Sequence, residues 1–239
     1  FEGMGTFVRD NDLKPDGVPA SVRGHLHEAR VTVIDGTTAA PHHLNPHIPY
    51  ETMPMPADVA PRSFAMPMGA AFSPAGDTLY VAAFGSSAVA VIDVADLEAG
   101  TFSPALGDRI TVTGGGPTFV VVDATGTRAF VSTRFDNGVS TLDLATGVET
   151  AHVRLFNPEP VFVQQGRRFL YDARLTSSNG EASCGSCHVF GDMDDLAWDL
   201  GDPDGDVMPT FNRQGPLGSR ASFHPLKGPM TTQTLRGMA

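Results

Sequence analysis

Cysteine is scarce in this 239-residue sequence, and long apolar runs are missing. The only two cysteines, Cys184 and Cys187, lie close together, so none is left for a separate disulfide framework. The longest apolar stretches, such as 89–92 and 119–122, are far shorter than the roughly 20 residues that cross a bilayer, so we expect no transmembrane span. The first residues show neither the basic nor the apolar region of a signal peptide, which leaves open a mature exported segment or a piece of a longer protein.

Basic residues are also few. The chain has 16 Lys and Arg against 27 Asp and Glu, a formal net charge of -11. Binding of DNA or RNA needs a basic face for the phosphates, so nucleic acid is not an expected partner. The acidic surface is compatible with steering of a basic redox partner, and equally with an ordinary acidic exported protein. Hydrophobic residues make up 41% of the chain, enough for a real core.

An internal repeat occupies the first part of the chain. Residues 69–95 align without a gap on residues 119–145, and each unit reads as strand, glycine turn, strand, polar turn and strand. Matching pairs are Gly76 with Gly126, Tyr80 with Phe130, Val81 with Val131 and Asp93 with Asp143. A repeat of this period predicts a solenoid or a propeller.

These units resemble the YVTN family of β-propeller repeats. The first unit carries SPAG, LYV and VID between residues 73 and 93, and the second carries matching residues between 123 and 143. The VTVID sequence at 31–35 reads as the end of an earlier unit. A propeller closes with about four to eight blades of about 40–45 residues. We therefore expect an incomplete all-β propeller over residues 1–157, with further blades belonging to a larger polypeptide; a β-sandwich is the alternative.

A long segment rich in proline and histidine, about residues 36–68, interrupts the repeats. Its composition predicts an irregular loop. His42, His43 and His47 could bind a metal there. No cysteine accompanies them, and exposed histidines in a proline-rich loop are the simpler interpretation.

The strongest motif is CGSCH at residues 184–188. Two thiols separated by two residues can both add to the vinyl groups of a porphyrin, and the histidine that follows can ligate its iron. Cys184 and Cys187 are therefore predicted to hold one covalent haem c, with His188 as the proximal ligand. A thioredoxin-like redox pair would need a βαβ context, and a structural zinc site would need four ligands; the sequence offers neither.

The flanks of this motif resemble the bacterial di-haem cytochrome c peroxidase/MauG superfamily. GRRFLYDARLT at 166–176, Gly180 and SCGSCH at 183–188 match that family's "G..LF.D.RLS..G..SC.SCH", and KGPMTTQTLR at 227–236 is similar to its "GP.N.PTL.N". The resemblance implies a mostly α, loop-rich cytochrome c domain, here 158–239. It also implies a second CxxCH motif, which this sequence lacks, so a second haem would belong to a longer di-haem polypeptide.

The second axial ligand is less closely defined. His224, just before the GP stretch, occupies about the place of the distal histidine in the resembling peroxidases. Met230 is the rival, because methionine is a common axial ligand. A residue beyond Ala239 is the third alternative. No catalytic acid or base for peroxide cleavage can be named from the sequence.

An acidic stretch follows the haem motif. Asp202, Asp204 and Asp206 alternate as in a calcium loop, but Val207 and Arg213 stand where an EF-hand needs glycine and glutamate. An irregular calcium site is therefore an alternative to a solvated loop.

The sequence thus predicts a c-type haem oxidoreductase that transfers electrons, with a redox protein or a small electron donor as partner; the family resemblance implies peroxide reduction as a further activity. The rival hypotheses are a non-enzymatic electron carrier and a propeller binding module with an accessory haem. The resemblance implies a periplasmic or extracellular location, because haem c is attached after export.

Overall fold

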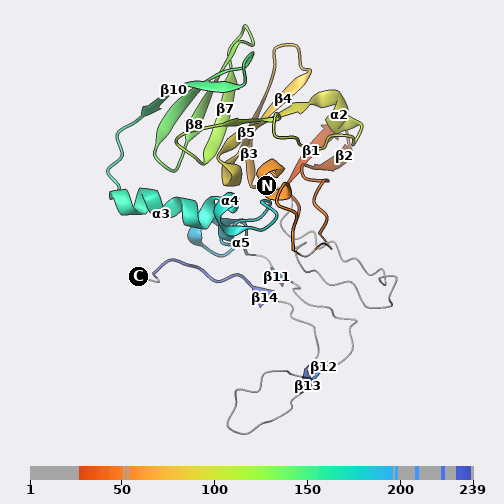
Figure 1. Cartoon of the computed structure of the whole chain (residues 1–239), viewed down its shortest axis with the longest axis vertical. Helices are drawn as coiled ribbons and strands as arrows, with labels where there is room; N and C mark the ends of the chain where they lie inside the picture. Colours follow the sequence, from red (N-terminus) through yellow and green to blue (C-terminus); the bar gives the residue numbers. More distant parts are fainter. Residues whose placement is uncertain are drawn as a thin grey trace.

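The computed structural model describes residues 27–50, 52, 54–195, 197–198, 208–209, 222–223 and 230–237. Within these residues the architecture is dominated by β-sheet (Figure 1). Two four-stranded antiparallel sheets stand side by side, and a group of short helices lies beneath the ends of their strands.

The first sheet contains β3 (Pro67–Phe72), β4 (Thr78–Ala83), β5 (Ala88–Asp93) and β6 (Arg109–Thr111) in sequence order. The 3-10 turn η1 (Phe84–Ser86) joins β4 to β5, and α2 (Val94–Glu98) lies between β5 and β6. The second sheet contains β7 (Pro117–Val122), β8 (Arg128–Thr133), β9 (Gly138–Asp143) and β10 (Val148–Arg154), again in sequence order. Each sheet is therefore an up-and-down meander, which is the topology of a propeller blade.

The sequence repeat is confirmed as a repeat of local structure. Gly76 and Gly126 both have positive φ, at 77° and 70°, in the first turn of each sheet. After the third strand, Asp93 accepts a hydrogen bond from the amide of Asp96, and Asp143 does the same for Thr146. The same turn chemistry thus ends the same strands twice.

The two sheets pack against each other through alternate side chains. The cluster between them contains Tyr80, Val89, Ile110 and Val112 from the first sheet and its edge, and Val120, Ala129, Val131 and Leu142 from the second. This is period-2 burial: every second residue of β8 and β9 faces the neighbouring sheet. Face-to-face packing of successive meanders gives the described residues a propeller-like fold.

A two-stranded hairpin covers the other face of the first sheet. It consists of β1 (Arg30–Asp35) and β2 (Thr38–His43), and its flanking residues Ala29 and Leu44 join a core with Leu79, Val81 and Ile92. The prediction of an irregular loop over 36–68 is wrong at both its ends, because β2 and the start of β3 fall within it. Pro41 is tolerated in β2 because that strand has a partner on one side only.

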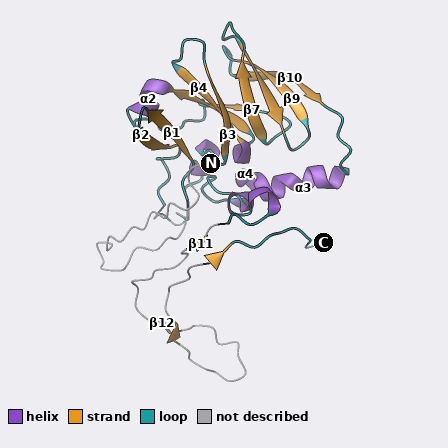
Figure 2. Ribbon diagram, turned by 180° about the vertical axis from the view of Figure 1, so that it is seen from behind, coloured by secondary structure: helices purple, strands orange, loops and turns teal. Residues whose placement is uncertain are grey.

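The helices follow the second sheet. They are α3 (Val161–Tyr171), α4 (Ala173–Thr176), α5 (Cys184–Cys187) and the 3-10 turn η2 (Val189–Gly191), with α1 (Val59–Arg62) earlier in the chain. Figures 1 and 2 both show α3 and α4 beneath the strand ends. Beyond η2 the described residues form two pairs of two-residue strands, β11 (Ala197–Trp198) with β14 (Met230–Thr231) and β12 (Met208–Pro209) with β13 (Ser222–Phe223). The helical part is thus smaller than predicted, and none of the described helices is long and apolar enough to cross a membrane.

Candidate haem site

The CxxCH motif forms one turn of helix. α5 begins at Cys184 and ends at Cys187, and the amide of His188 closes the turn on the carbonyl of Cys184 at 3.0 Å. Residues three apart lie on the same side of a helix, so both sulfurs can reach one ligand. Cys184 is exposed and Cys187 half-buried, and both are free thiols. The predicted pair is therefore brought together as covalent attachment requires.

His188 is oriented by a distant backbone group. Its Nδ1 lies 2.7 Å from the carbonyl oxygen of Gln233. A carbonyl only accepts hydrogen bonds, so this contact fixes the proton on Nδ1 and leaves Nε2 with a lone pair. Metal-ligating histidines commonly donate their other ring N–H to a carbonyl in this way. The histidine is thus in the tautomer that a haem iron needs.

The two thiols of the motif differ in their surroundings, because Cys184 is exposed and Cys187 is half-buried. Burial raises the pKa of the Cys187 thiol, and with Asp194 and Cys184 nearby it reaches about 11. The Cys187 thiol is therefore protonated at neutral pH. The described residues contain no group of three His, Cys, Asp or Glu side chains that could hold a metal ion.

The helix that carries the cysteines is pressed against α3. A Cβ added at Gly185 would lie 2.4 Å from Cδ1 of Tyr171 and 3.2 Å from the carbonyl oxygen of Leu170. Only glycine allows this approach, which explains the first residue between the two cysteines. Tyr171 in turn packs with Phe84 and Phe135 from the two sheets, with ring centroids at 5.2 and 6.3 Å.

A buried glutamate fixes the chain just before Cys184. Glu181 is 1% exposed and accepts hydrogen bonds from groups of the β1–β2 hairpin and the loop after it. The donors are the amide of Ala29 at 3.0 Å, His43 Nε2 at 2.7 Å, Asn45 Nδ2 at 2.9 Å and the Tyr50 hydroxyl. Burial opposes ionisation of Glu181, but the hydrogen bonds and charge around it outweigh that effect and lower its pKa.

A second buried carboxylate fixes the chain at the end of α3. Asp172, also 1% exposed, accepts two hydrogen bonds from the Arg174 guanidinium, at 2.9 and 2.6 Å, and one from Ser87 Oγ at 3.0 Å. Burial opposes ionisation here too, yet Arg174 and Ser87 lower the pKa of Asp172. Ser87 belongs to the turn between β4 and β5, so the helical segment is tied to the first sheet.

Apolar side chains that follow the motif are exposed, with no described residue covering them. Phe190 and Met193, which follow His188, are 63% and 46% exposed. A porphyrin presents a large apolar face that would shield such side chains from water. The thiol pair, the oriented imidazole and the apolar surroundings together fit a covalently bound haem.

The other predicted site residues are less informative. Met230 lies in β14, opposite Trp198 of β11. His224 and the aspartates at 202, 204 and 206 lie outside the described residues, so the predictions about them stay untested. Of the loop histidines, His43 binds Glu181, and His47 lies 3.3 Å from the carbonyl oxygen of Val59.

Comparisons with known proteins find partial similarities only. No protein-family model matches the chain, and no curated protein does. Among solved structures, hydrazine synthase of Kuenenia stuttgartiensis is 22% identical over 40% of this chain and 25% of its own, with a TM-score of 0.34. The β-propeller domain of Cps50 (Swd1) from Myceliophteria thermophila is 11% identical over 48% of this chain and 32% of its own, with a TM-score of 0.34. A nidogen/laminin complex is 15% identical over 54% of this chain and 39% of its own, also with a TM-score of 0.34.

The chain therefore spans between a quarter and two fifths of the length of these structures. The propeller-like fold is shown by the two four-stranded meanders and by the apolar cluster between them.

Proposed function

We propose that this chain is a c-type haem oxidoreductase of the cytochrome c peroxidase/MauG type, fused to a propeller. The observation that carries the proposal is the CGSCH turn, whose histidine is held in the iron-binding tautomer by the carbonyl of Gln233. Haem, when bound, supplies an iron that accepts and donates single electrons. Electron transfer, and peroxide reduction if the second axial position opens, follow as proposed activities.

The chain's own residues have distinct roles in this proposal. Cys184 and Cys187 would hold the porphyrin through thioether bonds, and His188 would ligate the iron through Nε2. Gln233 keeps the imidazole in orientation, because its carbonyl binds the opposite ring nitrogen. Glu181 ties the chain just before the motif to the β1–β2 hairpin, and Asp172 ties the end of α3 to the first sheet. An exported protein, a redox-protein partner and a larger di-haem polypeptide are further parts of the proposal.

The distal ligand is proposed to be His224 rather than Met230. Gln233 is bound to the proximal imidazole, and Met230 is only three residues away, which at most spans about 10 Å of chain. A side chain so close to the proximal anchor is poorly placed to pass around the porphyrin to its other face. The chain between His224 and Gln233 is three times as long as that between Met230 and Gln233.

Covalent attachment is the first test. The holoprotein, made in a host that attaches haem c, should keep its pyridine haemochrome absorbance after denaturation and acid-acetone extraction. Cys184→Ala with Cys187→Ala should lose it, while Ser177→Ala, outside the motif, should retain it. Release of free haem from the native protein under these conditions would refute the proposal.

The axial ligands are the second test. His224→Ala should convert a low-spin ferric spectrum to high-spin and admit cyanide, while Met230→Ala should leave the spectrum unchanged. The reverse pattern, with a sulfur-to-iron band near about 700 nm in the native protein, would establish Met230 instead.

A further inference from the structure

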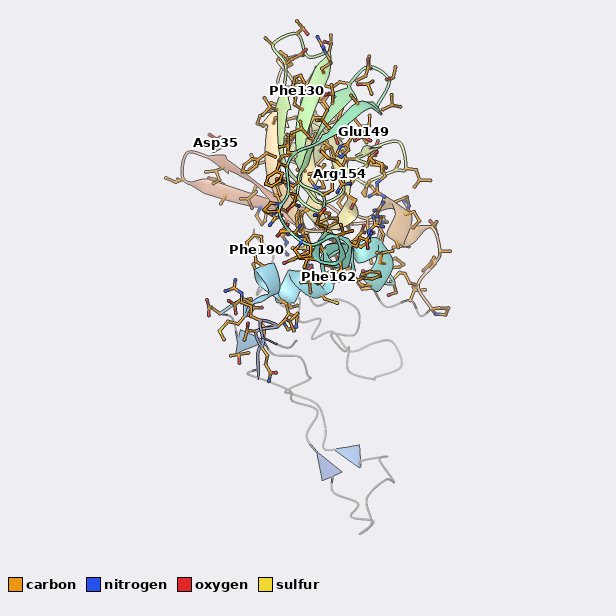
Figure 3. The ribbon with its side chains drawn as sticks, turned by 90° about the vertical axis from the view of Figure 1, so that its left-hand side faces the viewer. Asp35, Phe130, Glu149, Arg154, Phe162 and Phe190 are labelled. Carbon is orange, nitrogen blue, oxygen red and sulfur yellow. The ribbon has the colours of Figure 1, made fainter. Side chains whose placement is uncertain are left out.

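A cavity lies between the end of the second sheet and the helix α3. Its volume is 640 Å³, and it is lined by β10, the turn between β8 and β9, and α3. Figure 3 places Arg154 between Glu149 of β10 and Phe162 of α3. A cavity of this size suits a small organic molecule.

Asp136 and His152 of the cavity lining belong to a closed hydrogen-bonded network. The Asp136 carboxylate binds His152 Nε2 at 2.7 Å and the Thr133 hydroxyl at 2.8 Å. The other ring nitrogen, His152 Nδ1, lies 3.0 Å from Ser140 Oγ, and Ser140 is fully buried. Both imidazole nitrogens are therefore occupied, so the pair offers no free base. The nearby Glu149 is likewise held, by the amide of Thr113 at 3.1 Å.

The groups left to meet a ligand are cationic. Arg154 is 63% exposed and donates to Gln164 Oε1 at 3.0 Å, while its Nε is 3.8 Å from Asp136. Arg168, also exposed, makes no ion pair with any described residue. Two guanidiniums line the cavity against one carboxylate that His152 and Thr133 already bind. In a chain with a net charge of -11, this is a local excess of positive charge.

The remaining wall is apolar and open. Val161 and Phe169 of α3 are 63% and 65% exposed and line the cavity with Phe135. An aromatic wall beside paired guanidiniums matches a molecule with a flat apolar body and a carboxylate at one end.

We propose that this cavity binds a small aromatic carboxylate. The acid group lies between Arg154 and Arg168, and the ring lies against Val161 and Phe169. The site is independent of the haem, but α3 continues from Phe169 to Tyr171, which contacts the cysteine-bearing turn at Gly185.

Titration calorimetry of the holoprotein tests the proposal, with 2-naphthoate as the probe and 2-naphthalenemethanol as its neutral analogue. Naphthoate should bind more tightly than the alcohol. Arg168→Gln should weaken naphthoate binding about tenfold, because a charge-assisted contact is lost, and leave the alcohol unaffected. Arg128→Gln removes an exposed arginine of β8 that does not line the cavity, and should change nothing.

Three results would overturn the proposal. They are equal binding of the acid and the alcohol, an equal loss in Arg128→Gln and Arg168→Gln, and binding only to the haem-free Cys184→Ala, Cys187→Ala protein. The last result would assign the cavity to the carboxylates of the haem itself. Thermal unfolding of Arg168→Gln, an exposed position, verifies that the variant is folded.

Discussion

The sheets and the segment around α3 to α5 are held together by different physics. In the sheets, alternate apolar residues of two repeated units meet in one cluster, so many small contributions add up. In the segment, α3 fully buries none of its residues, and two buried carboxylates, together with the Tyr171 ring, connect the segment to distant parts of the chain. A single substitution should therefore affect the segment far more than an average position of the sheets.

The largest effect should come from Glu181→Ala. It leaves the buried Asn45 and the half-buried His43 and Tyr50 without their common acceptor. Breaking a buried charged network from one side costs about 3–5 kcal/mol. Urea unfolding should show that loss, whereas Glu98→Ala at an exposed position should cost less than about 0.5 kcal/mol. Equal losses in the two variants would show that Glu181 has no special role.

Asp172→Ala should cause the next largest loss in the free energy of unfolding. It removes the acceptor of Arg174 and Ser87, but the Arg174 side chain is 37% exposed and water can replace part of what it loses. We therefore expect about 2–3 kcal/mol from urea unfolding. A loss larger than that of Glu181→Ala would reverse the ranking and indicate that Asp172 is the stronger anchor.

Much of the sheet region, and little of the anchoring, could be predicted from the sequence. Gly76 and Gly126 each form a turn through their own positive φ, so local sequence patterns are sufficient to predict the repeated strands. Glu181 binds His43 across 138 positions, and Gln233 binds His188 across 45. No local pattern encodes such pairs. The composition of the proline-rich segment predicts exposed or metal-binding histidines, whereas in the structure His43 is a partner of the buried Glu181.

Substitution of the first-turn glycine in each repeat should have an intermediate effect on stability. Gly76→Ala and Gly126→Ala both place a side chain at positive φ, which costs about 1–2 kcal/mol. At Gly126 the new Cβ would also lie 3.0 Å from Pro74 Cδ, whereas at Gly76 it meets open space. Gly126→Ala should therefore be the more destabilised variant in thermal unfolding, and Gly107→Ala, in open space without positive φ, should be close to neutral. Equal melting temperatures for the two repeat variants would contradict a contact between the repeats at Pro74.

The smallest effect is a difference in acid sensitivity between the native protein and Glu181→Gln. Burial alone would raise the pKa of Glu181, but the hydrogen bonds and charge from His43, with those from Asn45 and Tyr50, lower it. A carboxylate whose pKa is lower in the fold stabilises the fold above its unfolded pKa of about 4.3, and that contribution is lost as the pH falls through the folded value.

Glutamine keeps the shape and an acceptor but cannot titrate. Between about pH 7 and about pH 3 the free energy of unfolding should therefore fall less in Glu181→Gln than in the native protein. Asp172 and the other carboxylates titrate equally in both, so their contribution cancels in the difference. Urea unfolding at several pH values measures this difference. Parallel pH profiles would mean that Glu181 has the same pKa in the folded and unfolded chains, and that its hydrogen bonds anchor the cysteine-bearing turn without stabilising its charge.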